Sequence, residues 1–244
     1  MILISTLVGM KLHTQGWRFE HSFYYFIGLA FLVLLGFWPS YFSKFVNGTA
    51  DFTFYFHFHA FILSTWILML IVQPLLIQNK KLRLHRITGK IGYVIGPLIF
   101  VSIILLSHSR QTNYESGWDI GLFISFKDLL LLAVAFFIAF AYRHQVELHA
   151  RGMISTGIIC IEPALARYTA SILGINQTSY LLTIAGVYGV LVLLIFFERN
   201  QKKGRWVFPL ILALYSLVHS VIFFDLHFDW WQAFGRWFFA LPLT

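Results

Sequence analysis

Seven stretches of predominantly apolar residues follow one another along this chain, and they constrain its fold more than any other feature. A helix needs about 20 such residues to cross the hydrocarbon core of a bilayer. None of the stretches alternates polar and apolar residues as a half-buried strand would, and open strand edges cannot exist in lipid. We therefore predict an all-α, polytopic transmembrane helical bundle with seven spans. The spans cover residues 21–41, 56–78, 87–109, 118–142, 152–174, 179–197 and 206–226.

The chain carries too little charge for a soluble protein of its size. Only 11% of its 244 residues are charged and 59% are hydrophobic, whereas an average soluble domain has roughly 25% charged residues. The outer surface must therefore face lipid, which makes the bilayer the first expected partner. No linker rich in Pro, Gly, Ser or charge divides the chain, so residues 1–244 are predicted to form a single transmembrane domain.

The connections between the stretches predict the orientation of the chain. Cytoplasmic loops of membrane proteins are enriched in Lys and Arg. With seven spans, thirteen basic residues fall on the side of the N-terminus and three on the other side, so we predict N-in and C-out in the cell inner membrane. This asymmetry explains the net charge of +8, so we expect no nucleic-acid partner. The thirteen are Lys11, Arg18, Lys80, Lys81, Arg83, Arg86, Lys90, Arg143, Arg151, Arg199, Lys202, Lys203 and Arg205; the three are Lys44, Arg110 and Arg236.

The aromatic tail at residues 228–243 is too short to cross the membrane. Tryptophan favours the headgroup region because its ring is amphipathic, and Trp230, Trp231 and Trp237 all lie in this tail. We expect it to lie in the outer interface.

Four charged residues lie inside predicted spans, where ionisable groups are costly and are functional candidates by default. They are Lys127, Asp128, Glu162 and Arg167. Their signs cancel, and we expect a cross-helix pair between Asp128 and Arg167 and a second pair between Lys127 and Glu162. Two interpretations stay open: ion pairs that only lock two spans together, or part of a ligand site.

The second span carries a polar stripe. His59, Trp66 and Gln73 recur every seven residues, a spacing that drifts only about 20° per step on a helix. The three side chains therefore share one face, which is predicted to face the bundle. The alternative to a ligand-binding role is helix packing with interhelical hydrogen bonds.

Histidines cluster near span ends on both sides. On the outer side His59, His108 and His219 could converge with Asp128 and Arg167 in a pocket, and on the inner side His85 precedes span three while His149 precedes span five. Imidazoles from different helices can hold one haem, as in membrane b-type cytochromes. The single cysteine excludes a Cys-based metal site.

Two motifs resemble an uncharacterised bacterial multi-pass membrane family, domain of unknown function 2306. The first runs from His59 to Tyr93 and the second from His149 to Arg167, so the similarity covers roughly residues 56–167. The resemblance implies a helical bacterial membrane protein, but the family has no assigned reaction. The resemblance therefore identifies a set of residues but no function. These residues are His59, Trp66, Gln73, His85, Arg86, Gly89, His149, Met153 and Arg167.

Three functions remain open from the sequence. The first is a polar intramembrane pocket that binds or conducts a small ligand, formed by His59, Trp66, Gln73, Lys127, Asp128, Glu162, Arg167 and His219. The second is a redox protein with haem or a metal ion bound by paired histidines: His85 with His149 on the inner side, or His59 with His108 or His219 on the outer side. The third is a non-catalytic membrane scaffold or assembly factor. The sequence predicts neither the substrate nor the oligomeric state.

Overall fold

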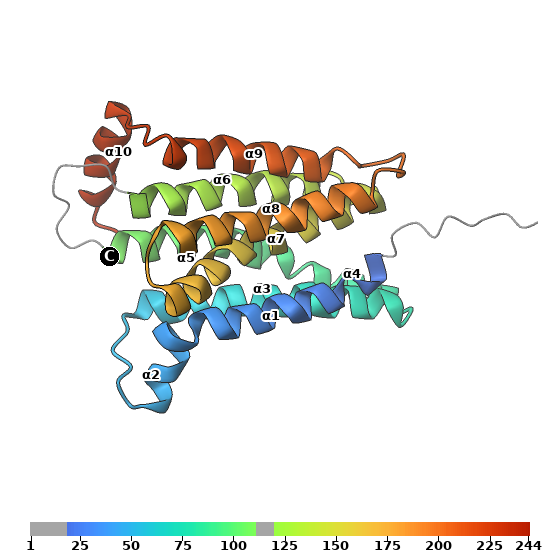
Figure 1. The fold of residues 1–244 in the computed structure, drawn as a ribbon. Helices are drawn as coiled ribbons and strands as arrows, with labels where there is room; N and C mark the ends of the chain where they lie inside the picture. Colours follow the sequence, from blue (N-terminus) through green and yellow to red (C-terminus); the bar gives the residue numbers. More distant parts are fainter. Residues whose placement is uncertain (1–18, 111–119) are drawn as a thin grey trace, which may run out of the picture.

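The computed structural model describes residues 19–110 and 120–244, and these residues form a bundle of helices that run side by side (Figure 1). No strand occurs among them. The helices are η1 (Phe19–His21), α1 (Phe23–Phe37), η2 (Trp38–Phe42), α2 (Ser43–Val46), α3 (Phe54–Gln78), α4 (Leu82–Gly89), α5 (Gly92–Ser109), α6 (Ile120–Ala141), α7 (Val146–Leu173), α8 (Gln177–Phe197), α9 (Val207–Phe223) and α10 (Asp229–Phe239).

The protein is an all-α, multi-pass membrane protein by the length and composition of its helices. Within the described residues, five helical segments are long and apolar enough to cross a bilayer: Phe23–Val46, Phe54–Gln78, Leu82–Ser109, Ile120–Ala141 and Gln177–Phe197. The α9 helix is also apolar but has only 17 residues. The α7 helix has 28 residues and is less apolar, because it contains Glu147, Arg151, Glu162 and Arg167.

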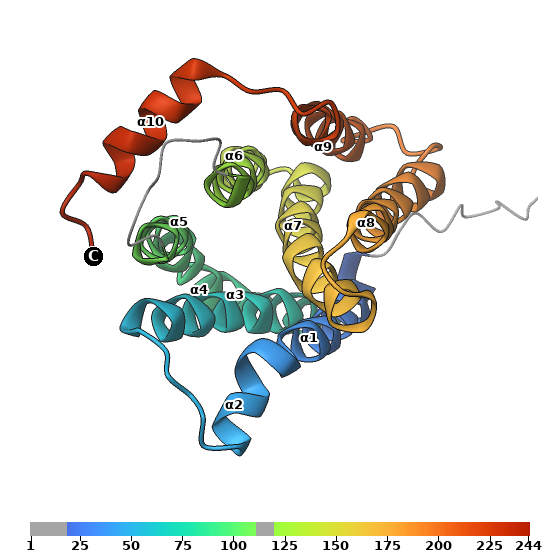
Figure 2. The same cartoon turned by 60° about the vertical axis from the view of Figure 1, so that its left-hand side comes forward.

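The charged α7 helix is the most enclosed element of the bundle. It packs against α1, α3, α6, α8 and α9, and it lies between α6, α8 and α1 in Figure 2. Charged side chains inside a membrane face the interior of the bundle, because exposure to lipid is costly. The central place of α7 therefore follows from its composition.

Small residues allow α7 to approach its neighbours closely. A Cβ atom added at Gly152 would lie 2.6 Å from the backbone nitrogen of Ala139 in α6, and one at Gly36 of α1 would lie within overlap distance of the Ala164 carbonyl oxygen. Membrane helices use such residues to bring their backbones together. These contacts bring the backbones of α1 and α6 close to that of α7.

The bundle has two distinct ends, which we name after the helices that lie there (Figure 1). The α10 end holds α10, α2 and the first residues of α3 and α6. The α4 end holds α4, the first residues of α7 and the connection between α8 and α9.

Candidate functional site

Lys127 of α6 lies at the centre of a buried polar cluster. Its Nζ atom donates to Asp128 Oδ1 and to Glu162 Oε2 of α7, both at 2.7 Å, and its side chain has no exposed surface. The ammonium group also lies 5.4 Å from the centre of the Tyr215 ring of α9. Two carboxylates and an aromatic ring therefore compensate for the loss of hydration of this one charge.

The cluster continues from Glu162 into α9 and α8. Glu162 Oε1 lies 3.3 Å from His219 Nε2, and His219 Nδ1 lies 3.2 Å from the Tyr188 hydroxyl. An imidazole with its proton on Nε2 satisfies both contacts, because Nε2–H donates to the carboxylate and Nδ1 accepts from the hydroxyl. Asp128, Lys127, Glu162, His219 and Tyr188, which we call the Lys127 network, therefore form a continuous chain across four helices.

Two tyrosines border the Lys127 network with buried hydroxyl groups. Neither the Tyr180 nor the Tyr215 hydroxyl has a hydrogen-bond partner among the described residues. Tyr215 is fully buried, and its ring and that of Tyr180 lie 5.4 and 6.4 Å from the His219 ring. A buried hydroxyl without a partner costs about 1–3 kcal/mol, so packing alone gives these two groups no advantage over phenylalanine.

The charge pairing differs in part from the sequence prediction. The Lys127–Glu162 pair is present, but Asp128 pairs with Lys127 and not with Arg167. Arg167 instead donates from Nη1 to the Pro163 carbonyl oxygen at 2.9 Å and lies 4.4 Å from the centre of the Phe37 ring. The reason is geometric: the Arg167 side chain extends toward the end of α1, while the Asp128 carboxylate reaches the ammonium group of its own neighbour in the chain.

The three histidines expected on the outer side have different hydrogen-bond partners. His59 Nδ1 lies 3.1 Å from Ser102 Oγ of α5, whereas His219 belongs to the Lys127 network. His108 Nδ1 lies 2.6 Å from Thr244 Oγ1, and its ring packs on Phe238 of α10. His59 nevertheless lies close enough to Arg167, and His219 close enough to Asp128, for electrostatic interaction. A single outer-side pocket that includes these groups stays a prediction.

The polar stripe on α3 faces the bundle, as the seven-residue spacing predicts. Trp66 is fully buried and donates from Nε1 to Thr156 of α7 at 3.1 Å. Gln73 is buried against α4; with its amide oriented to satisfy its neighbours, it accepts from Thr88 at 2.8 Å and from the Gly89 N–H at 3.3 Å. Interhelical hydrogen bonds therefore account for Trp66 and Gln73 without a ligand.

His85 and His149 both lie at the α4 end, close enough to interact electrostatically. His149 Nδ1 donates to the Ala139 carbonyl oxygen at 2.8 Å, so the neutral imidazole carries its proton on Nδ1. In the satisfied orientation of its amide, Gln73 donates to His85 Nδ1 at 2.5 Å, so the proton of this imidazole is on Nε2.

The sequence did not reveal a second buried ion pair at the α4 end. Arg151 was predicted to flank a cytoplasmic loop, yet it is 1% exposed, and its Nε atom donates to Glu198 Oε2 at 2.7 Å. Its Nη1 atom donates to the Glu147 carbonyl oxygen at 2.8 Å. Burial raises the pKa of the Glu198 carboxyl, and the hydrogen bond from Arg151 acts in the opposite direction.

The sequence prediction also missed the tyrosines of the site. Tyr215 and His219 are four residues apart, so they lie on one face of α9, and this spacing could have linked the tyrosine to the site. Tyr180 and Tyr188 carry no comparable signal, because the chain contains 11 tyrosines and 27 phenylalanines, so one more aromatic residue does not mark a site.

Residues 19–110 and 120–244 contain no group of three or more His, Cys, Asp or Glu side chains that could hold a metal ion. No protein-family model matches the chain, and no curated protein or solved structure matches it. The resemblance to domain of unknown function 2306 and the haem interpretation therefore stay predictions.

Proposed function

We propose that this protein is a single-domain inner-membrane protein whose Lys127 network binds or conducts a small ligand within the membrane. The proposal includes seven spans, with α7 and α9 crossing the bilayer beside the five longer apolar segments. It places the N-terminus and the α4 end in the cytoplasm and the C-terminus outside.

The distribution of basic residues supports this orientation. The connections at the α4 end carry Lys80, Lys81, Arg143, Lys202 and Lys203, whereas Lys44, Arg110 and Arg236 belong to the α10 end (Figure 1). An excess of Lys and Arg in short connections is typical of the cytoplasmic side.

The functional proposal rests on the two buried tyrosine hydroxyls beside the Lys127 network. A purely structural lock would need only the ion pair between α6 and α7. Here hydrogen bonds extend that pair into α8 and α9, and Tyr180 and Tyr215 add donors that no described residue uses. Such donors can serve a ligand or a transferred proton.

The chemistry of the network favours the proton among small ligands. Asp128, Lys127, Glu162, His219 and Tyr188 can each lose or accept a proton, and consecutive members lie within hydrogen-bond distance. Chains of Asp, Glu and His inside membrane helices are typical of proton relays.

Proton flux into liposomes tests the proposal. Purified protein is reconstituted with a trapped pH-sensitive dye, and a potassium gradient with valinomycin sets the membrane potential. We expect flux above that of protein-free liposomes for the wild type and for His108→Gln, which lies outside the network. Glu162→Gln should reduce flux to the protein-free level, because the carboxylate joins Lys127 to His219.

The variant Tyr215→Phe distinguishes a loss of proton flux from a loss of folding. The variant removes only a hydroxyl that has no partner among the described residues, so thermal stability should be unchanged or higher. Reduced flux with unchanged stability would support a role in conduction. The proposal fails if the wild type conducts no protons and mass spectrometry of the denatured protein recovers no small molecule.

A further inference from the structure

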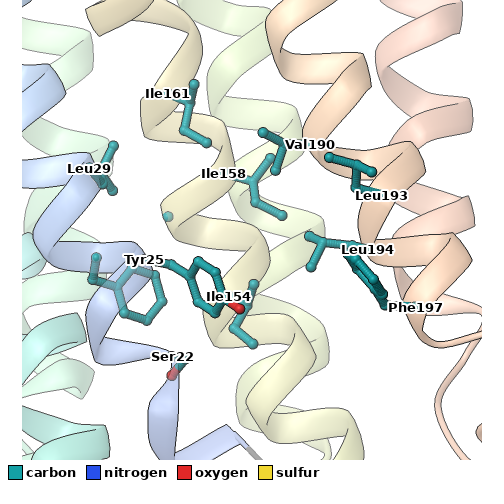
Figure 3. Close-up of a pocket in the computed structure, with 12 residues that line it drawn as sticks. Ser22, Tyr25, Leu29, Ile154, Ile158, Ile161, Val190, Leu193, Leu194 and Phe197 are labelled. Carbon is teal, nitrogen blue, oxygen red and sulfur yellow. The ribbon is translucent and has the colours of Figure 1, made fainter. Parts of the chain in front are cut away.

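A groove of about 220 Å³ runs between α1, α7 and α8, apart from the Lys127 network. In Figure 3, α7 forms its back, with α1 on one side and α8 on the other. Its lining is apolar except for the hydroxyl groups of Ser22 and Tyr25, and residues such as Leu29, Ile158 and Leu193 form its walls.

The groove exists because α1 and α8 both pack against α7 but lie apart from each other. Gly157 lies at its back, where a Cβ atom would be 2.5 Å from the Phe26 ring. The α1 backbone therefore lies close to α7, and the space remains between α1 and α8. Leu193, on the α8 wall, is 55% exposed.

One end of the groove lies next to a concentration of positive charge. Ser22 and Phe197 mark this end, because Ser22 immediately precedes α1 and Phe197 is the last residue of α8 (Figure 3). The connection that follows α8 contains Arg199, Lys202, Lys203 and Arg205, all of them exposed.

We propose that this groove is a binding site for an anionic phospholipid. One acyl chain lies between α1 and α8, and the phosphate contacts the basic connection after Phe197. The wall from Val190 to Phe197 spans about 10 Å at 1.5 Å per residue, which is within one leaflet of a hydrocarbon core about 30 Å thick. An apolar groove that ends at Lys and Arg side chains matches both parts of such a lipid, since basic segments beside a membrane attract anionic headgroups.

Native mass spectrometry of the full-length protein tests this site. The protein is released from detergent and titrated with phosphatidylglycerol or with phosphatidylcholine carrying the same acyl chains. We expect the wild type to retain phosphatidylglycerol in preference to phosphatidylcholine.

Two neighbouring residues of α8 provide a matched pair of variants. Leu193 lines the groove, whereas Val192 is similarly exposed but does not line it. Leu193→Trp should fill the groove and abolish retention of phosphatidylglycerol, while Val192→Trp should leave it unchanged. Replacement of Lys202 and Lys203 by Gln should remove the preference for phosphatidylglycerol, whereas Lys44→Gln at the α10 end should preserve it.

Three results would overturn the proposal. The first is equal retention of the two lipids by the wild type, which would remove the role of the basic connection. The second is an equal loss of lipid in Leu193→Trp and Val192→Trp. The third is a dimer that Leu193→Trp dissociates, because the groove would then receive a second copy of the chain.

Discussion

At the scale of single residues, the main feature of this protein is the pairing of two buried cations, Lys127 and Arg151, with carboxylates. Lys127 has two carboxylate partners, and Arg151 has one carboxylate and one carbonyl partner. A buried charge loses its hydration and is stable only with such compensation. Neither cluster can lose one member without exposing another to the apolar interior.

The Arg151–Glu198 pair gives a prediction about stability. Arg151→Met should lower the free energy of unfolding by about 3–5 kcal/mol, because it leaves a buried carboxylate without its partner. Glu198→Gln should also destabilise the protein, but the double variant should lose less than the sum of the two single losses. Thermal melting of the four proteins in detergent measures the coupling, and additive losses would show that the pair contributes no specific interaction.

At the scale of helices, close contact between backbones decides which residue each position tolerates. Gly152 of α7 lies against the backbone of Ala139, while Gly189 of α8 has no atom within 4 Å of an added Cβ. The two glycines are alike in sequence terms, since both lie within helices. Their neighbours alone distinguish them.

These two glycines form a matched test of helix packing. Gly152→Ala should destabilise the protein by about 1–3 kcal/mol, because the added methyl group overlaps backbone atoms of α6 that cannot rotate away. Gly189→Ala should be neutral or slightly stabilising, since alanine favours a helix over glycine. Melting temperatures of both variants check this order, and a larger loss at Gly189 would contradict the packing of α6 on α7.

At the scale of the whole molecule, the α7 helix contributes residues to all three features described above. It contacts five other helices and contributes Glu162 to the Lys127 network, Arg151 to the second ion pair and Gly157 to the groove between α1 and α8. The proposed topology places these three features at different depths along one helix.

The proposed topology can be tested with single cysteines. Cys160 is buried, so it should not react with a membrane-impermeant thiol reagent in intact cells. Asn176→Cys, between α7 and α8, should react from outside, whereas Lys202→Cys should react only after the membrane is permeabilised. The reverse pattern would invert the orientation, and the same accessibility for both would contradict a crossing by α8.

The sequence by itself determined that the chain is an all-α membrane protein and where its helices lie. Several predicted spans correspond to one helix with similar bounds; for example, residues 179–197 correspond to Gln177–Phe197. Others differ: residues 21–41 are divided between α1 and η2, and α7 begins six residues before the predicted span 152–174. The reason is that a bilayer provides no hydrogen bonds to the backbone, so every crossing segment must satisfy its own N–H and C=O groups. Length and apolar composition therefore locate most of the long helices, whereas the charged α7 is less apolar than the others.

Only the tertiary structure decided which polar side chains meet. The sequence identified Lys127, Asp128, Glu162 and Arg167 as unusual, but the partner of Asp128 depends on how α6 and α7 are rotated about their axes. The sequence also predicts Arg151 beside a loop, whereas in the structure it pairs with Glu198 at the end of α8. The position of a residue within its span determines its depth in the membrane. Its partner depends on how neighbouring helices pack against each other, which the sequence of one span does not determine.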